Sequence, residues 1–333
     1  MATSRLRPGN ITSSMEFPMK TMVKQMEVGQ KITGFFVCAS KIVKVDRNGN
    51  RYMDLRLSDA SGVIGAKMWD VNDADIERFA GHDIVKVQAV VNSGFRGAPE
   101  LKVEQIRKAT AEDDFELEAL LPVSPRDPAE MEAELAALRG TISNPYLAVL
   151  LDEILTGEMY RAFCEAPAAK GFHHNYIHGL LEHSLSVGRV ADAISSQYED
   201  VNRDLLVTGA ILHDIGKTME FDYTTAIDYS DSGRLLGHIV LGERIVADAI
   251  GRLQDFPAEL KLQLLHLILS HHGEKEYGSP VRPKTPEAFI LNHADDIDAK
   301  ANVFAKKRAG TDEPWTEFNR VLDRFLYLRK VEE

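Results

Sequence analysis

The sequence has few cysteines, no long apolar run and no overall excess of positive charge. Its 333 residues include only Cys38 and Cys164, which excludes a disulfide framework and a cysteine-based zinc site. No apolar run approaches the roughly 20 residues that span a bilayer, and the first residues lack the apolar segment of a secretory signal. We therefore expect a cytoplasmic protein with no membrane partner, in which histidine and carboxylate bind any metal ion.

The net charge of −12 is unevenly distributed along the chain. Residues 1–110 hold 17 Lys and Arg against 12 Asp and Glu, which gives +5, and the remaining residues carry −17. A basic region joined to an acidic one is a modest indication of a nucleic-acid-binding module, although a solvated surface would give +5 equally well. The chain is long enough for two domains with separate cores.

The N-terminal region has the pattern of a small β-barrel. Residues 1–17 lack periodicity and are expected to form a flexible leader. Five β-rich runs then follow, with an Asn-Gly turn after the first and a short helix, capped by Asn72, after the third. The runs are Lys31–Val45, Arg51–Leu57, Gly62–Trp69, Asp83–Val91 and Glu100–Ile106. Three strands, a helix and two strands is the order of an OB-fold, which we place in residues 18–110.

The second and third of these strands predict a surface for single-stranded nucleic acid. Strand alternation puts four side chains on one outer face: Tyr52, Arg56, Lys67 and Trp69. Bases stack on aromatic rings, and Arg and Lys follow the phosphates. An alternative role for Trp69, to which we give equal weight, is as a core residue or as a contact at the domain junction. A loop with Phe95 and Arg96 is a further candidate contact, with loop decoration as its alternative.

The remainder of the chain is predicted to be helical. Residues 111–159 form an acidic, proline-containing linker with connecting helices, residues 160–315 an all-α domain, and residues 316–333 a C-terminal helix and tail. Five helices of the all-α domain carry potential metal ligands. They are Ile177–Gln197, Arg203–Lys217, Gly237–Leu253, Ala258–His272 and Pro286–Lys300.

The potential ligands form an ordered series along these helices: His183, His213, Asp214, His238, His271, His272 and Asp295. A single histidine on an apolar helix face is more often a core residue than a ligand. Five helices that each present a His or Asp favour a metal site, and imidazole with carboxylate suits hard divalent cations or iron. A carboxylate beside a histidine can bridge two ions, which can activate a hydroxide and bind a phosphate for in-line displacement.

Lys217 lies three residues after Asp214, on the same helix face. It can stabilise the charge that develops on a phosphate, so Asp214 and Lys217 are the predicted catalytic residues. The alternative for Lys217 is a solvated lysine at a helix end.

These residues resemble the H…HD…D signature of the HD-domain phosphohydrolases, in His183, His213-Asp214 and Asp295. His238 and His271-His272 resemble the additional ligands of the binuclear members. Further motifs agree: Pro167-Ala168-Ala169-Lys170, His173-His174, Gly179-Leu180-Leu181-Glu182-His183, Leu236-Gly237-His238, Ser270-His271-His272-Gly273 and Gly278-Ser279-Pro280. With the OB-fold, the chain resembles the YhaM family of 3′-to-5′ exoribonucleases over residues 18 to 310.

The resemblance implies the ligand sets of two metal sites. The first comprises His183, His213, Asp214 and Asp295, and the second comprises Asp214, His238 and His271, with His272 as an open candidate. Manganese is implied, with Mg²⁺, Fe²⁺ or Co²⁺ as alternatives. Asp298 is expected beside the ligands or in helix packing. Lys170, His173 and His174 are candidate contacts to the terminal nucleotide, and structural roles for them are equally open.

We therefore predict a metal-dependent 3′-5′ exonuclease that hydrolyses single-stranded RNA, and also DNA, to 5′-mononucleotides with a hydroxide activated by a binuclear centre. Polarity and RNA preference are implied by the resemblance alone. One alternative is an HD-domain nucleotide or cyclic-dinucleotide phosphohydrolase. Another is an OB-fold nucleic-acid-binding protein with a structural or regulatory HD domain. A homo-oligomer is left open.

Overall fold

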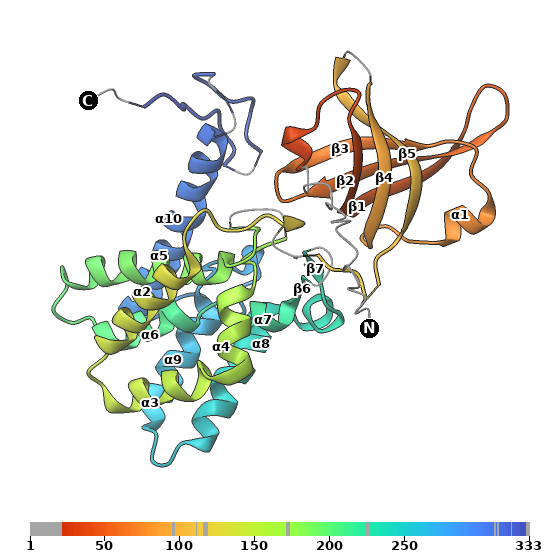
Figure 1. Ribbon diagram of the computed structural model, residues 1–333. Coiled ribbons are helices and arrows are strands. Elements are labelled where there is room, and N and C mark those ends of the chain that lie inside the picture. The colour runs from red at the N-terminus through yellow and green to blue at the C-terminus, as the bar shows by residue number, and fades with distance from the viewer. Residues whose placement is uncertain are drawn as a thin grey trace, which may run out of the picture. The chain divides into compact units, whose positions relative to one another are not determined.

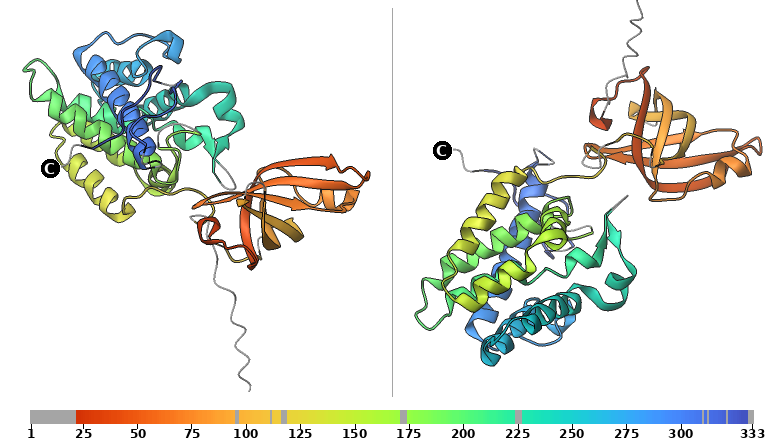
Figure 2. Two further views of the ribbon diagram at one scale, coloured as in Figure 1. Left: turned by 90° about the horizontal axis from the view of Figure 1, so that it is seen from above. Right: turned by 60° about the horizontal axis from the view of Figure 1, so that its bottom comes forward.

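A computed structural model describes residues 22–94, 97–110, 112–115, 119–170, 174–223, 227–309, 311, 313–320 and 322–330. The chain forms two compact units, Met1–Phe115 and Glu116–Glu333, which Figures 1 and 2 display. The predicted leader, the loop residues Phe95 and Arg96, and His173 lie outside the described residues. No helix in the described ranges is long and apolar enough to cross a membrane.

The first unit is a closed five-stranded barrel with the strand order β1-β2-β3-β5-β4 (Figure 1). Its elements are β1 (Lys31–Val45), β2 (Arg51–Asp59), β3 (Gly62–Met68), α1 (Asp73–Glu77), β4 (Ile84–Ser93) and β5 (Pro99–Lys108). The first half of β1 pairs with β4 and its second half with β2, with an irregularity between Cys38 and Ser40. The parallel pairing of β3 with β5 closes the barrel. The predicted OB-fold is confirmed.

Strand alternation fills the interior of the barrel. Met53, Leu55 and Leu57 of β2 are fully buried, and they lie across from Met68, Ala66 and Ile64 of β3. Because successive side chains point to opposite faces, Tyr52 and Arg56 are directed outward. Asn72 caps α1 through a capping box with Asp75.

The second unit is helical. Its helices are α2 (Pro128–Gly140), α3 (Pro145–Ile154), α4 (Gly157–Glu165), α5 (Gly179–Ser195), α6 (Arg203–Leu212), α7 (Lys217–Glu220), α8 (Asp231–Arg252), α9 (Ala258–Ser270) and α10 (Pro286–Ala309). Residues Leu205 to Leu212 of α6 are all buried, and α6 packs against α3, α5, α9 and α10. The His213-Asp214 pair, which follows α6 directly, is therefore placed inside the unit.

Two features of the second unit differ from the sequence-based expectation. A two-stranded sheet, β6 (Phe221–Asp222) with β7 (Asp228–Tyr229), interrupts the helices. The described residues 313–330 contain no helix, although a C-terminal helix was expected there. Pro314 cannot continue a helix, and the segment alternates buried and exposed side chains from Phe325 to Leu328, which is the period of a strand.

A glycine permits the contact between α7 and α8. A Cβ at Gly216 would lie 2.0 Å from the carbonyl oxygen of His238 and 2.5 Å from the amide nitrogen of Gly242. Any side chain at this position must push α8 away. The short distance between the Asp214 turn and His238 therefore depends on this residue.

We expect Gly216→Ala to lower the free energy of unfolding by about 1–3 kcal/mol, because overpacking forces the backbone to shift. The matched control is Gly251→Ala near the end of α8, where an added Cβ would meet no other atom within 4 Å. It should be neutral or stabilise by up to about 1 kcal/mol, since alanine favours helix over glycine. Denaturant unfolding followed by circular dichroism measures both, and equal stability of the two variants would contradict the prediction.

Candidate metal centre

Five helices direct histidine or aspartate side chains into one buried region. His183 lies within α5, His213 caps α6 and is followed by Asp214, and His271 caps α9. Gly237, with φ 73° and ψ 157°, kinks α8 immediately before His238. Asp295 belongs to α10. The structure brings together all seven predicted ligands, in groups whose ligand atoms lie within 4.8 Å of one another.

The first cluster comprises His183, His213, Asp214 and Asp295. His183 Nε2 lies 3.2 Å from His213 Nε2 and 3.2 Å from Asp295 Oδ1. Asp214 Oδ2 lies 3.4 Å from His183 Nε2 and 3.3 Å from His213 Nε2. His213 Nδ1 donates to the Ala210 carbonyl at 2.8 Å, which fixes the ring with Nε2 toward the cluster.

The second cluster faces the other oxygen of the same carboxylate. Asp214 Oδ1 lies 3.4 Å from His238 Nε2 and 3.5 Å from His271 Nε2. His238 Nδ1 donates to Glu220 Oε1 at 3.0 Å, and His271 Nδ1 donates to the Ile268 carbonyl at 2.7 Å. Both rings thus present Nε2 toward Asp214. Glu220 is a functional candidate that sequence reasoning missed, because nothing in one sequence relates it to His238.

Three buried atoms of the second cluster have no hydrogen-bond partner among the described residues: Asp214 Oδ1, His238 Nε2 and His271 Nε2. A buried polar atom without a partner costs about 1–3 kcal/mol. The three atoms lie close together, and two imidazole nitrogens with one carboxylate oxygen can act as ligands of a divalent cation. The residues present therefore fit a metal ion here.

His272 lies beside the second cluster. Its Nδ1 donates to the Tyr277 carbonyl at 2.9 Å, and its ring centroid is 5.1 Å from that of His238. Burial, together with the neighbouring His271, lowers the pKa of His272 to about 4. The ring is thus neutral at physiological pH, as a ligand must be, and His272 stays a candidate ligand.

Electrostatics distinguish the two clusters. Burial opposes the charged form of His183, but hydrogen bonds with Asp214, Asp295 and Asp298 raise its pKa well above the usual value. Burial lowers the pKa of His271. The pKa of Asp214 lies far below its usual value despite burial, because of Lys217 and His213. Without metal, the first cluster therefore holds a proton on His183, whereas His271 is neutral.

A carboxylate behind the first cluster orients His183. Asp298 Oδ2 accepts from His183 Nδ1 at 2.7 Å and lies 2.9 Å from His174 Nε2. His174 is only 2% exposed, and its Nδ1 is hydrogen-bonded to the Tyr176 hydroxyl at 2.8 Å. The structure thus places His174 behind the ligands and not at a surface that a nucleotide can reach. Lys170 is exposed and pairs with Asp228 at 2.6 Å.

A pocket of about 870 Å³ opens beside the clusters. Lys217, His272 and Asp295 form part of its wall, and Lys217 Nζ donates to Asp214 Oδ2. The remaining lining includes aromatic and cationic residues that sequence reasoning missed, among them Tyr277, Arg282, Phe289, His293 and Lys300. They come from α10 and from the segment after α9, so no local motif marked them.

The predicted outer face of the barrel is formed by β2, β3 and the residue after β3. Tyr52 and Trp69 stack with ring centroids 4.5 Å apart and an interplanar angle of 24°. Trp69 is 43% exposed and is therefore not part of the barrel core. Lys67 pairs with Glu100 at 2.7 Å, and Arg56 is exposed.

Comparison with known protein families identifies one domain of the chain. The HD domain family matches residues 180–300, the region that holds both clusters. Residues 180–300 therefore form an HD domain, which implies dependence on a divalent metal ion.

The relatives define the family more narrowly. The chain is 33% identical over 291 residues to the 3′-5′ exoribonuclease YhaM of Listeria monocytogenes serotype 4b, covering 86% of this chain and 91% of that protein. It is 35% identical over 277 residues to the 3′-5′ exoribonuclease YhaM of Bacillus subtilis, with coverages of 83% and 87%. The chain belongs to the YhaM family of 3′-5′ exoribonucleases, and it is a nuclease.

Metal binding should release protons and strengthen as pH rises. The raised pKa of His183 means that its ring is protonated in the metal-free protein, whereas a metal ligand must be neutral. The apparent affinity for Mn²⁺ should therefore fall as pH is lowered. Titration calorimetry in two buffers of different ionisation enthalpy detects the released protons. A binding enthalpy that is independent of the buffer would contradict this prediction.

Asp298→Asn should weaken metal binding about 10–100-fold, because the substitution disturbs the acceptor that orients His183. The matched control is Asp296→Asn on the same helix, whose carboxylate pairs with the exposed Lys300 at 2.7 Å. The control should bind metal as the wild type does. Equilibrium dialysis against Mn²⁺ compares the two, and equal affinities would show that Asp298 does not orient a ligand.

Proposed function

We propose that this chain removes nucleotides one at a time from the 3′ end of single-stranded RNA, and of DNA, and releases 5′-mononucleotides. The observation that carries the proposal is the Asp214 carboxylate, whose two oxygens face two separate sets of imidazole nitrogens. This is the arrangement that a binuclear phosphodiesterase needs. The family relatives, both named 3′-5′ exoribonucleases, support the polarity and the substrate.

The two clusters supply the ligands of two ions in this proposal. The first ion would be held by His183, His213, Asp295 and Asp214 Oδ2, and the second by His238, His271 and Asp214 Oδ1, with His272 as an additional candidate. Bound ions would supply an activated water and neutralise charge on the phosphate. Mn²⁺ is the proposed ion, because the family resemblance implies it, and mixed imidazole and carboxylate ligands could also hold Mg²⁺, Fe²⁺ or Co²⁺.

The protein's own residues then position the substrate. The pocket beside Lys217 and Asp295 would take the terminal nucleotide, with Tyr277 and Phe289 available for contact with the base. Lys217 would donate a hydrogen bond to a phosphate oxygen in the transition state. Tyr52 and Trp69 of the barrel would stack bases of the strand, and Arg56 and Lys67 would contact its phosphates.

The proposal is tested with 3′-labelled and 5′-labelled single strands in Mn²⁺, Mg²⁺ or EDTA. A 5′-labelled strand should give a ladder of progressively shorter products, and a 3′-labelled strand should release labelled mononucleotide at once. Asp214→Asn should abolish both, since it alters the ligand that the two clusters share. Turnover of mononucleotides or cyclic dinucleotides with intact oligomers would instead support a small-nucleotide phosphohydrolase, and binding without cleavage a nucleic-acid-binding protein.

Lys217→Ala should lower kcat by about 10²-fold with a smaller change in KM, because its contact is proposed for the transition state. Lys261→Ala on α9 is the control, and its kcat should not change. Bound metal is measured in both proteins. If Lys217→Ala loses its metal, the lysine acts by holding Asp214 and not by binding phosphate.

A further inference from the structure

The described residues 313–320 and 322–330 form an irregular antiparallel hairpin after α10, here called the C-terminal hairpin. Bridges join Trp315 to Tyr327 and Asn319 to Arg324, and the Thr316 amide donates to the Leu326 carbonyl at 3.0 Å. Its inner side has a small core of Leu322, Leu326 and Leu328, which packs against Val303 and Phe304 of α10. The hairpin therefore has a defined inner face and a defined outer face.

The outer face exposes four large aromatic side chains. Trp315 is 57% exposed, Phe318 48%, Phe325 60% and Tyr327 49%. They form two contacting pairs, with ring centroids 4.9 Å apart for Trp315 and Tyr327 and 5.4 Å apart for Phe318 and Phe325. Scattered single apolar residues on a surface need no explanation, but two exposed aromatic pairs on one short hairpin favour a contact site.

The segment that carries this patch is rich in basic residues, although the domain as a whole is acidic. Residues 306–330 hold seven Lys and Arg against four Asp and Glu, whereas residues 111–333 as a whole carry −17. Six of the seven basic residues are exposed and form no ion pair within the described ranges: Lys307, Arg308, Arg320, Arg324, Arg329 and Lys330. Their charge is thus available to an anion from solution.

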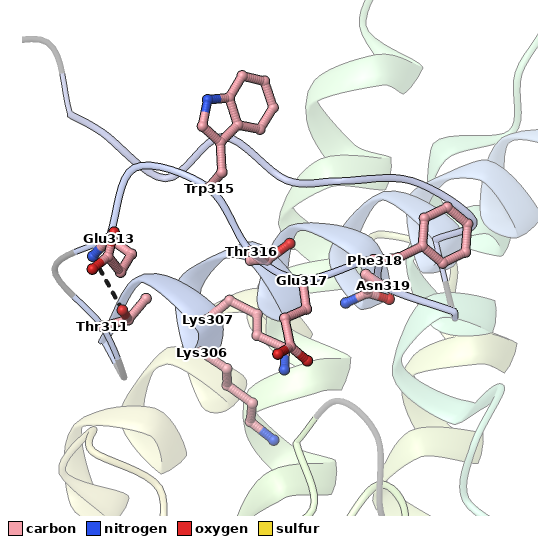
Figure 3. Close-up of a pocket in the computed structure, with 9 residues that line it drawn as sticks. All are labelled: Lys306, Lys307, Thr311, Glu313, Trp315, Thr316, Glu317, Phe318 and Asn319. Carbon is pink, nitrogen blue, oxygen red and sulfur yellow. Dashed lines mark hydrogen bonds between the residues drawn. The ribbon is translucent and has the colours of Figure 1, made fainter.

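A pocket of about 520 Å³ lies between the end of α10 and the first strand of the hairpin (Figure 3). Lys306 and Lys307 line it from the helix, and Trp315, Phe318 and Asn319 from the hairpin. Figure 3 shows the Trp315 ring turned away from the two lysines, toward the outer face. Trp315 thus belongs to the pocket wall while its ring faces outward, and Glu313 and Glu317 also line the pocket.

We propose that the C-terminal hairpin is a second contact for single-stranded nucleic acid, at which bases stack on the aromatic rings and phosphates pair with the surrounding cations. The inference deepens the proposed function and rests on it, because that function supplies the single strand. Base stacking on aromatic side chains contributes about 1–3 kcal/mol per base. A protein partner would need a complementary acidic face, whereas a phosphate backbone carries a negative charge at every nucleotide and can pair with each cation.

The two tryptophans of the chain allow a direct test. Trp69→Phe leaves Trp315 as the sole fluorescent tryptophan, and Trp315→Phe leaves Trp69. Each full-length protein is titrated in EDTA, so that nothing is cleaved, with a single-stranded RNA of about 16 nucleotides. We expect saturable quenching of Trp315, which a blunt RNA duplex of equal length or AMP at equal concentration does not reproduce.

Charge variants of the C-terminal hairpin test whether its cations bind RNA. Arg320→Glu with Arg329→Glu should weaken RNA binding at least about tenfold and reduce the salt slope by about 1.4, which is two phosphate contacts of a single strand. The control is the double variant Arg161→Glu with Arg244→Glu, two exposed arginines on α4 and α8. It makes the same change in charge away from the hairpin and should bind nearly as the wild type does. Thermal unfolding confirms that both proteins fold.

Two results would overturn the inference. Trp315 emission that stays constant while Trp69 is quenched shows that RNA binds elsewhere. Trp315 emission that changes with protein concentration alone, with a dimer in sedimentation, assigns the hairpin to a second copy of this chain. In either case a normal cleavage ladder leaves the proposed function intact. Loss of the ladder, with Trp315 still quenched, would instead count against the proposed function alone.

Discussion

The structure of the helical unit depends on one buried carboxylate. Asp214 is almost fully buried, and its two oxygens face different histidines. Lys217 and His213 hold it in the charged form, with a pKa far below the usual value. A buried anion of this kind is stable only with cations around it. The helices that meet at Asp214 are therefore packed about an electrostatic requirement as well as an apolar core.

The surroundings of Asp214 explain why the turn after α6 is so tightly packed. Gly216 allows α8 to approach until a Cβ would overlap the His238 carbonyl, and Glu220 then holds the His238 ring. On the opposite side, Asp298 orients His183 and is itself bonded to His174. The rings of His183 and His238 are thus each fixed by a carboxylate partner, which keeps Nε2 directed inward even without metal.

The sequence predicted the barrel and the ligand series because both are local patterns. Alternating residues such as Met53, Leu55 and Leu57 identify a strand, and His213-Asp214 stands at the end of an apolar helix. Glu220 could not be predicted, since its role arises only where α7 meets α8. A helix was predicted in residues 316–333, but the described part of this segment forms the C-terminal hairpin. His174 was open between a nucleotide contact and a structural role, and folding buries it behind His183.

The distribution of charge bears on how a polyanion can bind a domain that carries −17. Long-range repulsion from an acidic surface is screened beyond about 8 Å at physiological ionic strength, so contacts close to the strand dominate. The N-terminal region, with +5 in residues 1–110, and the exposed cations of the hairpin would supply such contacts at two places. At the clusters themselves, bound metal ions would offset the carboxylates. In this arrangement, binding of a polyanion depends on the charges close to the strand, and the negative net charge of the whole chain has little effect on it.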